Sequence, residues 1–351
     1  MWIHGIGHFH PENEITNAFL EELDIGTTNS WIMERVGIRS RRTVLPLDYI
    51  RETRNADPRG ANEAALYNNA STGQRAAEMA VSRAGLQLEN IGMVISGSCA
   101  PDTTVPADAC NIAAALGLEV PSFDIASACT TFGAQLHALS LMRPEKLPRF
   151  ILIVVPENTT RAVDFRDRRT AVLWGDGTAA AVLSAVEPGP IRIAHVDLAS
   201  SPAGAGKVVI PRNGHFFQDG RAVQRFAISR TSRCVTELRA AFPAVDDSRL
   251  HFIGHQANQL MLDAVCRACD IPPERHHSNV ADFGNTGAAG APGALSQDWH
   301  RFAVGDHIAL VGVGGGLTWT SAMLRFESPP AVAEHRPARA PLASPAEEAP
   351  A

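Results

Sequence analysis

Short apolar segments alternate with amphipathic ones along most of the chain, and this alternation limits the possible folds more than any other feature. In the first half, patterns typical of strands at 89–99, 121–127 and 149–157 alternate with patterns typical of helices at 108–118 and 129–142. Strands that alternate with helices form a mostly parallel sheet with helices on its faces. We therefore predict a layered α/β fold.

The second half repeats this plan. Helical patterns lie at 226–242, 258–271 and 291–302, and strand patterns lie at 250–256 and 307–316. With 351 residues, of which 45% are hydrophobic, the chain can bury the core of two such units. We predict a duplicated unit, with an N-terminal half over 1–187 and a C-terminal half over 188–327.

Two segments interrupt the pattern. Residues 45–72 are rich in polar and turn-forming residues, which indicates an insertion that lies over the surface near a pocket mouth. The tail, 328–351, is rich in Pro, Ala and Glu and has no apolar periodicity. Such a composition cannot bury enough surface to order itself, so we predict a disordered tail.

Composition excludes several classes of function. A net charge of −6 and a pI near 6.1 argue against a nucleic-acid partner, which would need a concentrated basic surface. The N-terminus has no signal-peptide pattern, and no apolar run is long enough to span a membrane. The six cysteines are scattered rather than dense. We expect a soluble cytoplasmic protein with reduced thiols.

Three junctions carry residues suited to chemistry. Cys129 lies where a strand runs into a helix, His255 ends a strand before a helix, and Asn285 lies in a glycine-rich turn. Each has a structural alternative: a buried thiol, a hydrogen-bonded histidine or a helix cap. Because functional groups gather at the carboxyl ends of strands in open α/β sheets, we expect these three to meet. With the glycines at 314–316, they provide a nucleophile, an imidazole, an amide and a backbone oxyanion hole, as acyl transfer through a thioester requires.

The segments ASAC, GHQAN, GNTGAAGAP and GVGGGLTW occur in this order and resemble the active-site signatures of the β-ketoacyl-ACP synthase III family. The resemblance covers roughly residues 1–327. It implies the thiolase fold, a five-layered α/β/α/β/α arrangement, and usually a homodimer. It also implies that Cys129 is acylated and that His255 and Asn285 assist condensation and stabilise the enolate. The backbone N–H groups of Cys129 and Gly315 would hold the thioester oxyanion.

The resemblance extends to substrate binding. Trp31 and Arg35 match the family's pantetheine and nucleotide region, although Trp31 could instead be a packing residue of an amphipathic helix. Arg168 matches the basic residue that flanks the adenine of coenzyme A. Asn258, in the motif GHQAN, is a further candidate for binding substrate. The implied partners are acyl-CoA and acyl carrier protein, whose thioesters are substrates.

Departures from the family pattern point toward specialised metabolism. Leu260 stands where housekeeping members carry a carrier-docking Arg, for which Arg267 is a candidate substitute. Val105 stands where a bulky aromatic often closes the acyl pocket across the dimer, which suggests a longer or branched acyl chain. The N-terminal segment is similar to ketosynthases that build dialkylresorcinol and cyclohexanedione precursors. Such a route would use a further base, for which Glu157 is a candidate; its alternative is a solvated loop carboxylate.

The leading hypothesis is a ketosynthase that is acylated on Cys129 and joins the acyl group to a second acyl or β-ketoacyl thioester. The alternatives are the housekeeping enzyme of fatty-acid initiation, an acyltransferase to an oxygen or nitrogen acceptor, and a non-catalytic partner subunit. No metal or redox cofactor is expected. His8 and His10 have no nearby carboxylate or Cys that would complete a metal site. Cys266 and Cys269 lie close in the sequence, but no second such pair of cysteines accompanies them, as a zinc site would require.

Overall fold

A computed structural model describes residues 1–328, so the predicted tail from residue 329 onward lies outside the described residues. Within this range the main sheet has nine strands in the order β11-β12-β13-β8-β1-β7-β6-β4-β5. Their bounds are β1 Trp2–Phe9, β4 Val94–Ser96, β5 Ser122–Asp124, β6 Ile151–Glu157, β7 Gly177–Ser184, β8 Ile191–Ser200, β11 Leu250–Gly254, β12 His307–Gly314 and β13 Thr318–Phe326.

The sheet consists of two halves that meet where β1 pairs with β8. The register there places Trp2 opposite Arg192 and Ile3 opposite Ile191. Strands β4, β5, β6 and β7 lie on the β1 side, and β11, β12 and β13 lie on the β8 side. The chain passes from one half to the other between β7 and β8, and both halves mix parallel and antiparallel pairs.

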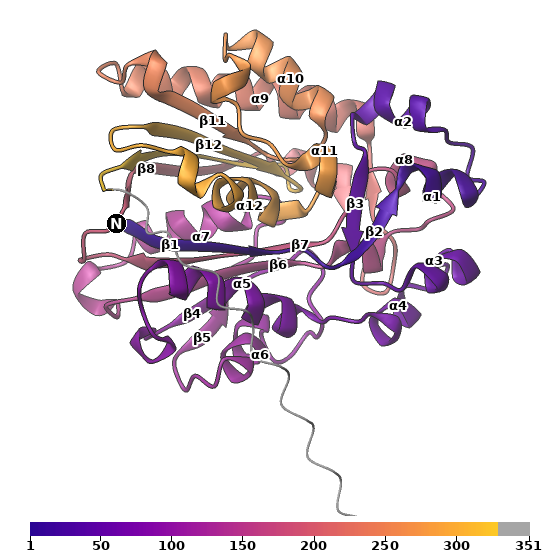
Figure 1. Cartoon of the computed structure of the whole chain (residues 1–351), viewed down its shortest axis with the longest axis horizontal. Coiled ribbons are helices and arrows are strands. Elements are labelled where there is room, and N and C mark those ends of the chain that lie inside the picture. The colour runs from indigo at the N-terminus through magenta and orange to yellow at the C-terminus, as the bar shows by residue number, and fades with distance from the viewer. Residues whose placement is uncertain (329–351) are drawn as a thin grey trace, which may run out of the picture.

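Helices lie in three layers around these two halves (Figure 1). Helices α5 (Asn69–Arg83) and α6 (Asp108–Ala115) cover the outer face of the first half. Helices α9 (Gly220–Ala241) and α10 (Gln259–Ala268) cover the outer face of the second. Helices α7 (Thr131–Ser140) and α12 (Gly290–Gln297) lie between the halves. The predicted five-layered α/β arrangement is therefore confirmed.

Helix α5 packs directly onto the backbone of β1. A Cβ on Gly5 would lie 2.2 Å from the carbonyl oxygen of Ala80, and one on Gly7 would lie 2.1 Å from that of Ala76. Both alanines are fully buried. Small residues on both surfaces thus set the spacing between this helix and the sheet.

The segment 45–72 is more ordered than its composition suggested. It forms α3 (Leu47–Thr53) and α4 (Pro58–Ala64), and its last residues begin α5. Ile50 is fully buried, and the buried side chain of Asn55 donates to the carbonyl oxygens of Arg161 and Val163, both at 2.9 Å. This segment is a packed part of the domain, because side chains such as Ile50 and Asn55 are buried against the rest of the chain.

The remaining helices and strands are β2 Asn13–Thr16, α1 Asn17–Glu22, α2 Asn29–Val36, β3 Ser40–Thr43, α8 Arg168–Ala171, β9 Val208–Val209, β10 Phe217–Gln218 and α11 Val280–Phe283. Of these, α2, α8, β9 and β10 contribute residues that line the cavity described below. The side chain of Thr28 caps the first turn of α2 by accepting a hydrogen bond from the backbone N–H of Trp31. Gly37, in the left-handed conformation, caps the other end of the helix.

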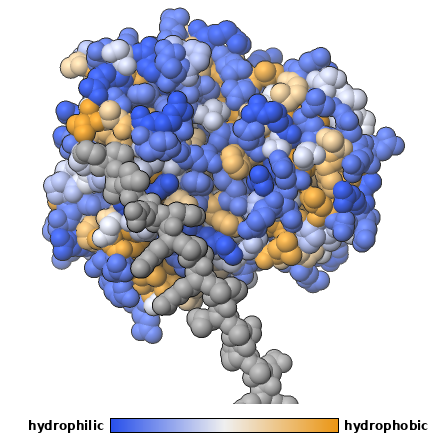
Figure 2. Space-filling model, viewed as in Figure 1, coloured by the Kyte–Doolittle hydropathy of each residue, from blue (hydrophilic) through white to orange (hydrophobic). Residues whose placement is uncertain are grey.

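The face of the molecule in Figure 2 is mostly hydrophilic, with hydrophobic side chains in small groups. Across residues 1–328, none of the helices combines the length and the apolar composition needed to cross a bilayer.

Candidate active site

The site lies where strands of both halves end. In the first half, β5, β4 and β6 are neighbouring parallel strands. Cys129 follows β5, Cys99 follows β4, and Glu157 is the last residue of β6. In the second half, His255 follows β11, which pairs in parallel with β12. The carboxyl ends of these strands meet, as the sequence predicted for Cys129 and His255.

Cys129 is presented by a tight turn rather than by a helix. Helix α7 begins at Thr131, two residues after Cys129. Ala128 has a φ of 45°, in the left-handed region that non-glycine residues seldom adopt. The backbone N–H and the hydroxyl of Thr131 both donate to the Ala128 carbonyl, at 3.0 and 2.7 Å. This constrained turn directs the cysteine toward the cavity described below.

Asn285 is oriented by its own turn. The backbone N–H of Gly287 donates to its side-chain oxygen at 3.0 Å, so the amide NH₂ is the end that remains for the cavity. The backbone of Asn285 is anchored to Leu173 and Gly175 on the facing segment. Asn285 is 7% exposed and His255 is 6% exposed, and both line the same cavity as Cys129. The site therefore offers one amide donor and one imidazole beside one thiol.

The pKa of the Cys129 thiol is held well below its usual value, first by a hydrogen bond from the Cys99 side chain and then by His255. Burial opposes this effect. A lowered pKa increases the fraction of the thiolate, which is the nucleophilic form.

Glu157 is fully buried, which excludes a solvated loop carboxylate. Its side-chain oxygens accept from the backbone N–H of Cys99 at 3.1 Å and of Ala288 at 3.3 Å. Burial, and then the charge of Cys129, raise the pKa of Glu157 to about 8. Glu157 lies behind Cys129 and is not among the residues that line the cavity, so its predicted part as a base acting on substrate stays a prediction.

The cavity has a volume of about 770 Å³ and runs from Cys129 to the protein surface. At its mouth, the guanidinium groups of Arg35 and Arg168 both lie over the ring of Trp31, each 4.8 Å from the ring centroid. Arg221 also lines it. Within residues 1–328, Arg35, Arg168 and Arg221 form no ion pair with a carboxylate, so these three cations can meet an anionic ligand.

The structure gathers most of the candidate residues in this one cavity. It is lined by Cys129, His255, Asn285, Gly315, Trp31, Arg35, Arg168 and Asn258. Asn258 also caps α10, because its side chain accepts from the backbone of Met261 at 2.8 Å.

Two candidates lie elsewhere. Val105 is 82% exposed on the loop after β4, and Arg267 is exposed on α10; neither lines the cavity. No residue of 45–72 lines it either, so the expectation that this segment lies at a pocket mouth is not met by this cavity.

The sequence analysis did not single out Cys99 or the apolar wall. That wall includes Val208, Phe216, Phe217 and Leu317, contributed largely by the β9–β10 hairpin. Cys99, like Cys129, lies at the end of a predicted strand, and this shared position could have identified it as a candidate. The hairpin carried no periodic pattern. Within the described part of the chain, no group of three or more His, Cys, Asp or Glu is arranged to hold a metal ion.

Two protein-family models match segments of the chain. Residues 123–202 match the family model "3-Oxoacyl-[acyl-carrier-protein (ACP)] synthase III", and residues 245–326 match the model of its C-terminal part. The chain is 32% identical over 340 residues to a β-ketoacyl-[acyl-carrier-protein] synthase III of Sulfurovum sp., covering 92% of this chain and 94% of that protein.

Two solved structures illustrate the fold and its range. The 3-oxoacyl-[acyl-carrier-protein] synthase III of Aquifex aeolicus is 28% identical, with a TM-score of 0.81, covering 93% of this chain and 99% of the other. The priming β-ketosynthase of the R1128 polyketide pathway is 26% identical, with a TM-score of 0.75, covering 94% and 97%. Both similarities extend over nearly the whole of each chain.

Proposed function

Because the chain belongs to the β-ketoacyl-[acyl-carrier-protein] synthase III family of condensing acyltransferases, we propose that it moves an acyl group from coenzyme A to Cys129 and extends it on acyl carrier protein. The observation that carries this proposal is the meeting of Cys129, His255 and Asn285 at one end of one cavity. Each has the chemistry that a two-step condensation needs.

In the first step, the Cys129 thiolate attacks the carbonyl carbon of the acyl thioester. The backbone N–H groups of Cys129 and Gly315 receive the oxyanion as the tetrahedral intermediate forms. The bond from carbon to the sulfur of coenzyme A then breaks, and the departing thiolate takes up a proton. The product is an acyl group on Cys129 and free coenzyme A.

In the second step, the bond from the α carbon of a malonyl thioester to its carboxylate breaks and CO₂ leaves. The electron pair stays at the α carbon, delocalised as the enolate, and this carbon attacks the acyl carbon. The amide NH₂ of Asn285 and the imidazole of His255 donate to the thioester oxygen, which gains negative charge in the enolate. The new carbon–carbon bond forms as the bond to Cys129 breaks, and the thiolate is restored. This chemistry uses no metal or redox cofactor.

The cavity mouth suits the arm of such substrates. Trp31 offers an aromatic face with two guanidinium groups beside it, and Arg221 adds a third cation. Phosphates of coenzyme A and of the carrier's phosphopantetheine are anions that arginines bind well. A cationic mouth on a chain of net charge −6 is a local feature, which favours binding of the arm over non-specific attraction.

The initiating role is the form of this reaction that the names of the relatives support best. A specialised role of the dialkylresorcinol or cyclohexanedione type is a second candidate. It rests on the N-terminal segment, on Val105 and Leu260, and on the similarity to a priming ketosynthase of a polyketide pathway.

We further propose that the protein acts as a homodimer through β5. This strand forms an edge of the sheet, and edge strands leave backbone groups free to pair. Phe123 on β5 is 36% exposed and Val105 on the adjacent loop is 82% exposed. Light scattering tests this proposal, and a monomer at working concentration would contradict it.

Intact-protein mass spectrometry after incubation with a panel of acyl-CoA thioesters tests the function, with Cys129→Ala as the control. A mass gain that the variant lacks establishes the nucleophile. Release of the acyl group by malonyl-ACP, compared with a β-ketoacyl-ACP, then separates the initiating role from the resorcinol type. Release by water or an amine alone would support simple acyl transfer, and no adduct from any donor would support a non-catalytic subunit.

A further inference from the structure

Cys99 lies on the middle one of three adjacent strand ends. Strand β4 pairs in parallel with β5 on one side and with β6 on the other. Cys99 follows β4, so it lies between Cys129, which follows β5, and Glu157, which ends β6. The adjacency of these strand ends and the hydrogen bond from its backbone N–H to Glu157 place Cys99 beside Cys129, and the two thiols shift each other's pKa. No part of the mechanism proposed above uses this second thiol.

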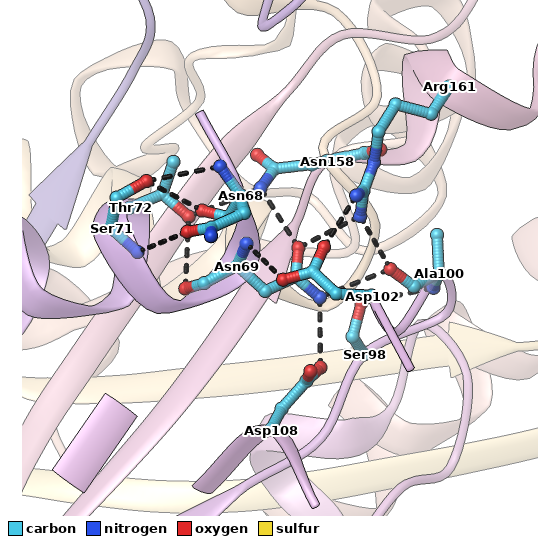
Figure 3. A network of polar contacts seen from close by, with 10 residues as sticks. All are labelled: Asn68, Asn69, Ser71, Thr72, Ser98, Ala100, Asp102, Asp108, Asn158 and Arg161. Carbon is cyan, nitrogen blue, oxygen red and sulfur yellow. Dashed lines mark hydrogen bonds and ion pairs between the residues drawn. The ribbon is translucent and has the colours of Figure 1, made fainter. Parts of the chain in front are cut away.

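The loop that carries Cys99 is fixed by a buried polar network (Figure 3). The carbonyl oxygen of Ala100 accepts from the side chains of Asn69 at 3.1 Å and Arg161 at 2.8 Å. Asp102 accepts from the backbone N–H of Asn69 at 2.7 Å and forms an ion pair with Arg161, whose side chain is only 5% exposed. The backbone immediately after Cys99 therefore has little freedom to move.

Glu157 fixes Cys99 from the other side. Its Oε2 atom accepts from the backbone N–H of Cys99 at 3.1 Å and from the hydroxyl of Thr159 at 3.3 Å. The carboxyl group is itself fully buried, so it holds this geometry without competition from water. Cys99 is thus anchored through its own N–H and through Ala100 and Asp102 in the loop that follows.

We propose that Cys99 is a positioning residue for the nucleophile: its S–H donates a hydrogen bond to the sulfur of Cys129 and holds that sulfur as the thiolate. A hydrogen bond to the charged form of a group favours that form. The inference rests on the proposed function only in taking Cys129 as the nucleophile. Once Cys129 is acylated, its sulfur loses the negative charge that Cys99 stabilises.

The electrostatics of the cluster support this direction of donation. The contact raises the pKa of Cys99 well above the usual thiol value, and burial and the Glu157 carboxylate raise it further. Cys99 therefore keeps its proton while Cys129 gives its own up. The titratable groups facing Cys129 are Cys99 after β4, Glu157 on β6 and His255 after β11.

The alternative is that Cys99 only fills space, as buried cysteines often do. Three substitutions separate the two roles. Cys99→Ser keeps a donor hydrogen, Cys99→Ala removes it, and Cys99→Val removes it while filling the space with methyl groups. Cys110→Ala is the matched control, since Cys110 is an exposed thiol on α6 outside the site.

The experiment measures the alkylation rate of Cys129 by iodoacetamide from about pH 5 to about pH 10, with the modified peptide identified by mass spectrometry. In Cys99→Ala we expect the midpoint to rise by about one pH unit, so that alkylation on the acid side is roughly tenfold slower. The limiting rate at alkaline pH should not change. Cys99→Ser and Cys110→Ala should keep the native midpoint.

A Cys99→Ala profile that coincides with the native one overturns the proposal, and so does an equal shift in the Ala and Ser variants, because packing would then explain it. If the Ala variant does not fold, the Val variant decides by the same criterion. Alkylation needs no thioester. A shifted midpoint in a protein that accepts no acyl donor would therefore reject the proposed function and support the role of Cys99.

Discussion

Gly314 lies so close to Cys129 that a Cβ on it would be 3.0 Å from the backbone nitrogen of Cys129 and 3.2 Å from its Cβ. Gly314 ends β12 in the second half, and Cys129 follows β5 in the first. This contact therefore fixes Cys129, the proposed nucleophile, against the sheet of the other half.

Gly314→Ala should displace Cys129 by a few tenths of an ångström and slow its acylation roughly tenfold, because reacting groups tolerate little misplacement. The rate of acyl-enzyme formation by mass spectrometry measures this. Gly206→Ala is the control, since a Cβ there meets nothing within 4 Å. Native acylation in Gly314→Ala would show that the turn absorbs the added methyl group.

The two steps of the proposed reaction should separate by mutation. Cys129→Ala should form no acyl-enzyme. His255→Ala should still be acylated but should condense roughly 10²- to 10⁴-fold more slowly, since it loses a donor to the enolate oxygen. Single-turnover assays with isolated acyl-enzyme measure the second step. Normal condensation by the His255 variant would show that the role assigned to the imidazole is wrong.

Glu157 should make stability depend on pH. Its pKa is raised from 4.5 to about 8 in the folded protein, so between these values the folded state holds one more proton than the unfolded state. The free energy of unfolding from this group is therefore greatest below pH 4.5 and falls as the pH rises toward 8.

Glu157→Gln imitates the protonated carboxyl group and should remove this part of the pH dependence. Denaturant melts of both proteins from about pH 5 to about pH 9 measure the difference in their slopes. The variant should gain stability relative to the native protein as the pH rises. Parallel curves would mean that Glu157 titrates near its ordinary pKa.

The proposed hydrogen bond between Cys99 and Cys129 should make the site sensitive to peroxide. Attack of the Cys129 thiolate on hydrogen peroxide gives a sulfenic acid and one water, and Cys99 then displaces the second water to form a disulfide. Two thiols are oxidised by two electrons, and one peroxide is reduced to two waters. We expect a cross-linked peptide of the two cysteines and recovery of acylation with dithiothreitol.

Cys99→Ala is the matched control for this oxidation. Without a resolving thiol, Cys129 should proceed to sulfinic acid, and dithiothreitol should not restore acylation. If the native protein also loses activity irreversibly, the two sulfur atoms do not reach each other.

Much of the fold could be predicted because its signals are local. The strands β4, β5, β6, β11 and β12 lie within the segments that the apolar patterns marked, and α6, α7 and α10 within the helical ones. The order of four short motifs was enough for the family. Local patterns also placed Cys129 and His255 at the ends of strands, from which their meeting follows by the geometry of parallel sheets.

The start of α7 was misplaced at Cys129 rather than Thr131. The reason is that Ala128 adopts the left-handed conformation and Thr131 holds this turn by a hydrogen bond, and neither feature alters the apolar pattern. The two helices within 45–72 were missed for a related reason. They are short, and their order comes from contacts such as that of Asn55 with the segment at 161–163.

The sequence by itself therefore determined the layered α/β class, the family and the three residues of the candidate chemistry, since propensity, periodicity and motif order are all written along the chain. Only the tertiary structure decided that β1 pairs with β8 to join the halves, that Glu157 is buried, and that the strand ends carrying Cys99, Cys129 and Glu157 are neighbours. These relationships depend on sheet order and on packing between distant segments, and no local pattern encodes which strand ends become neighbours.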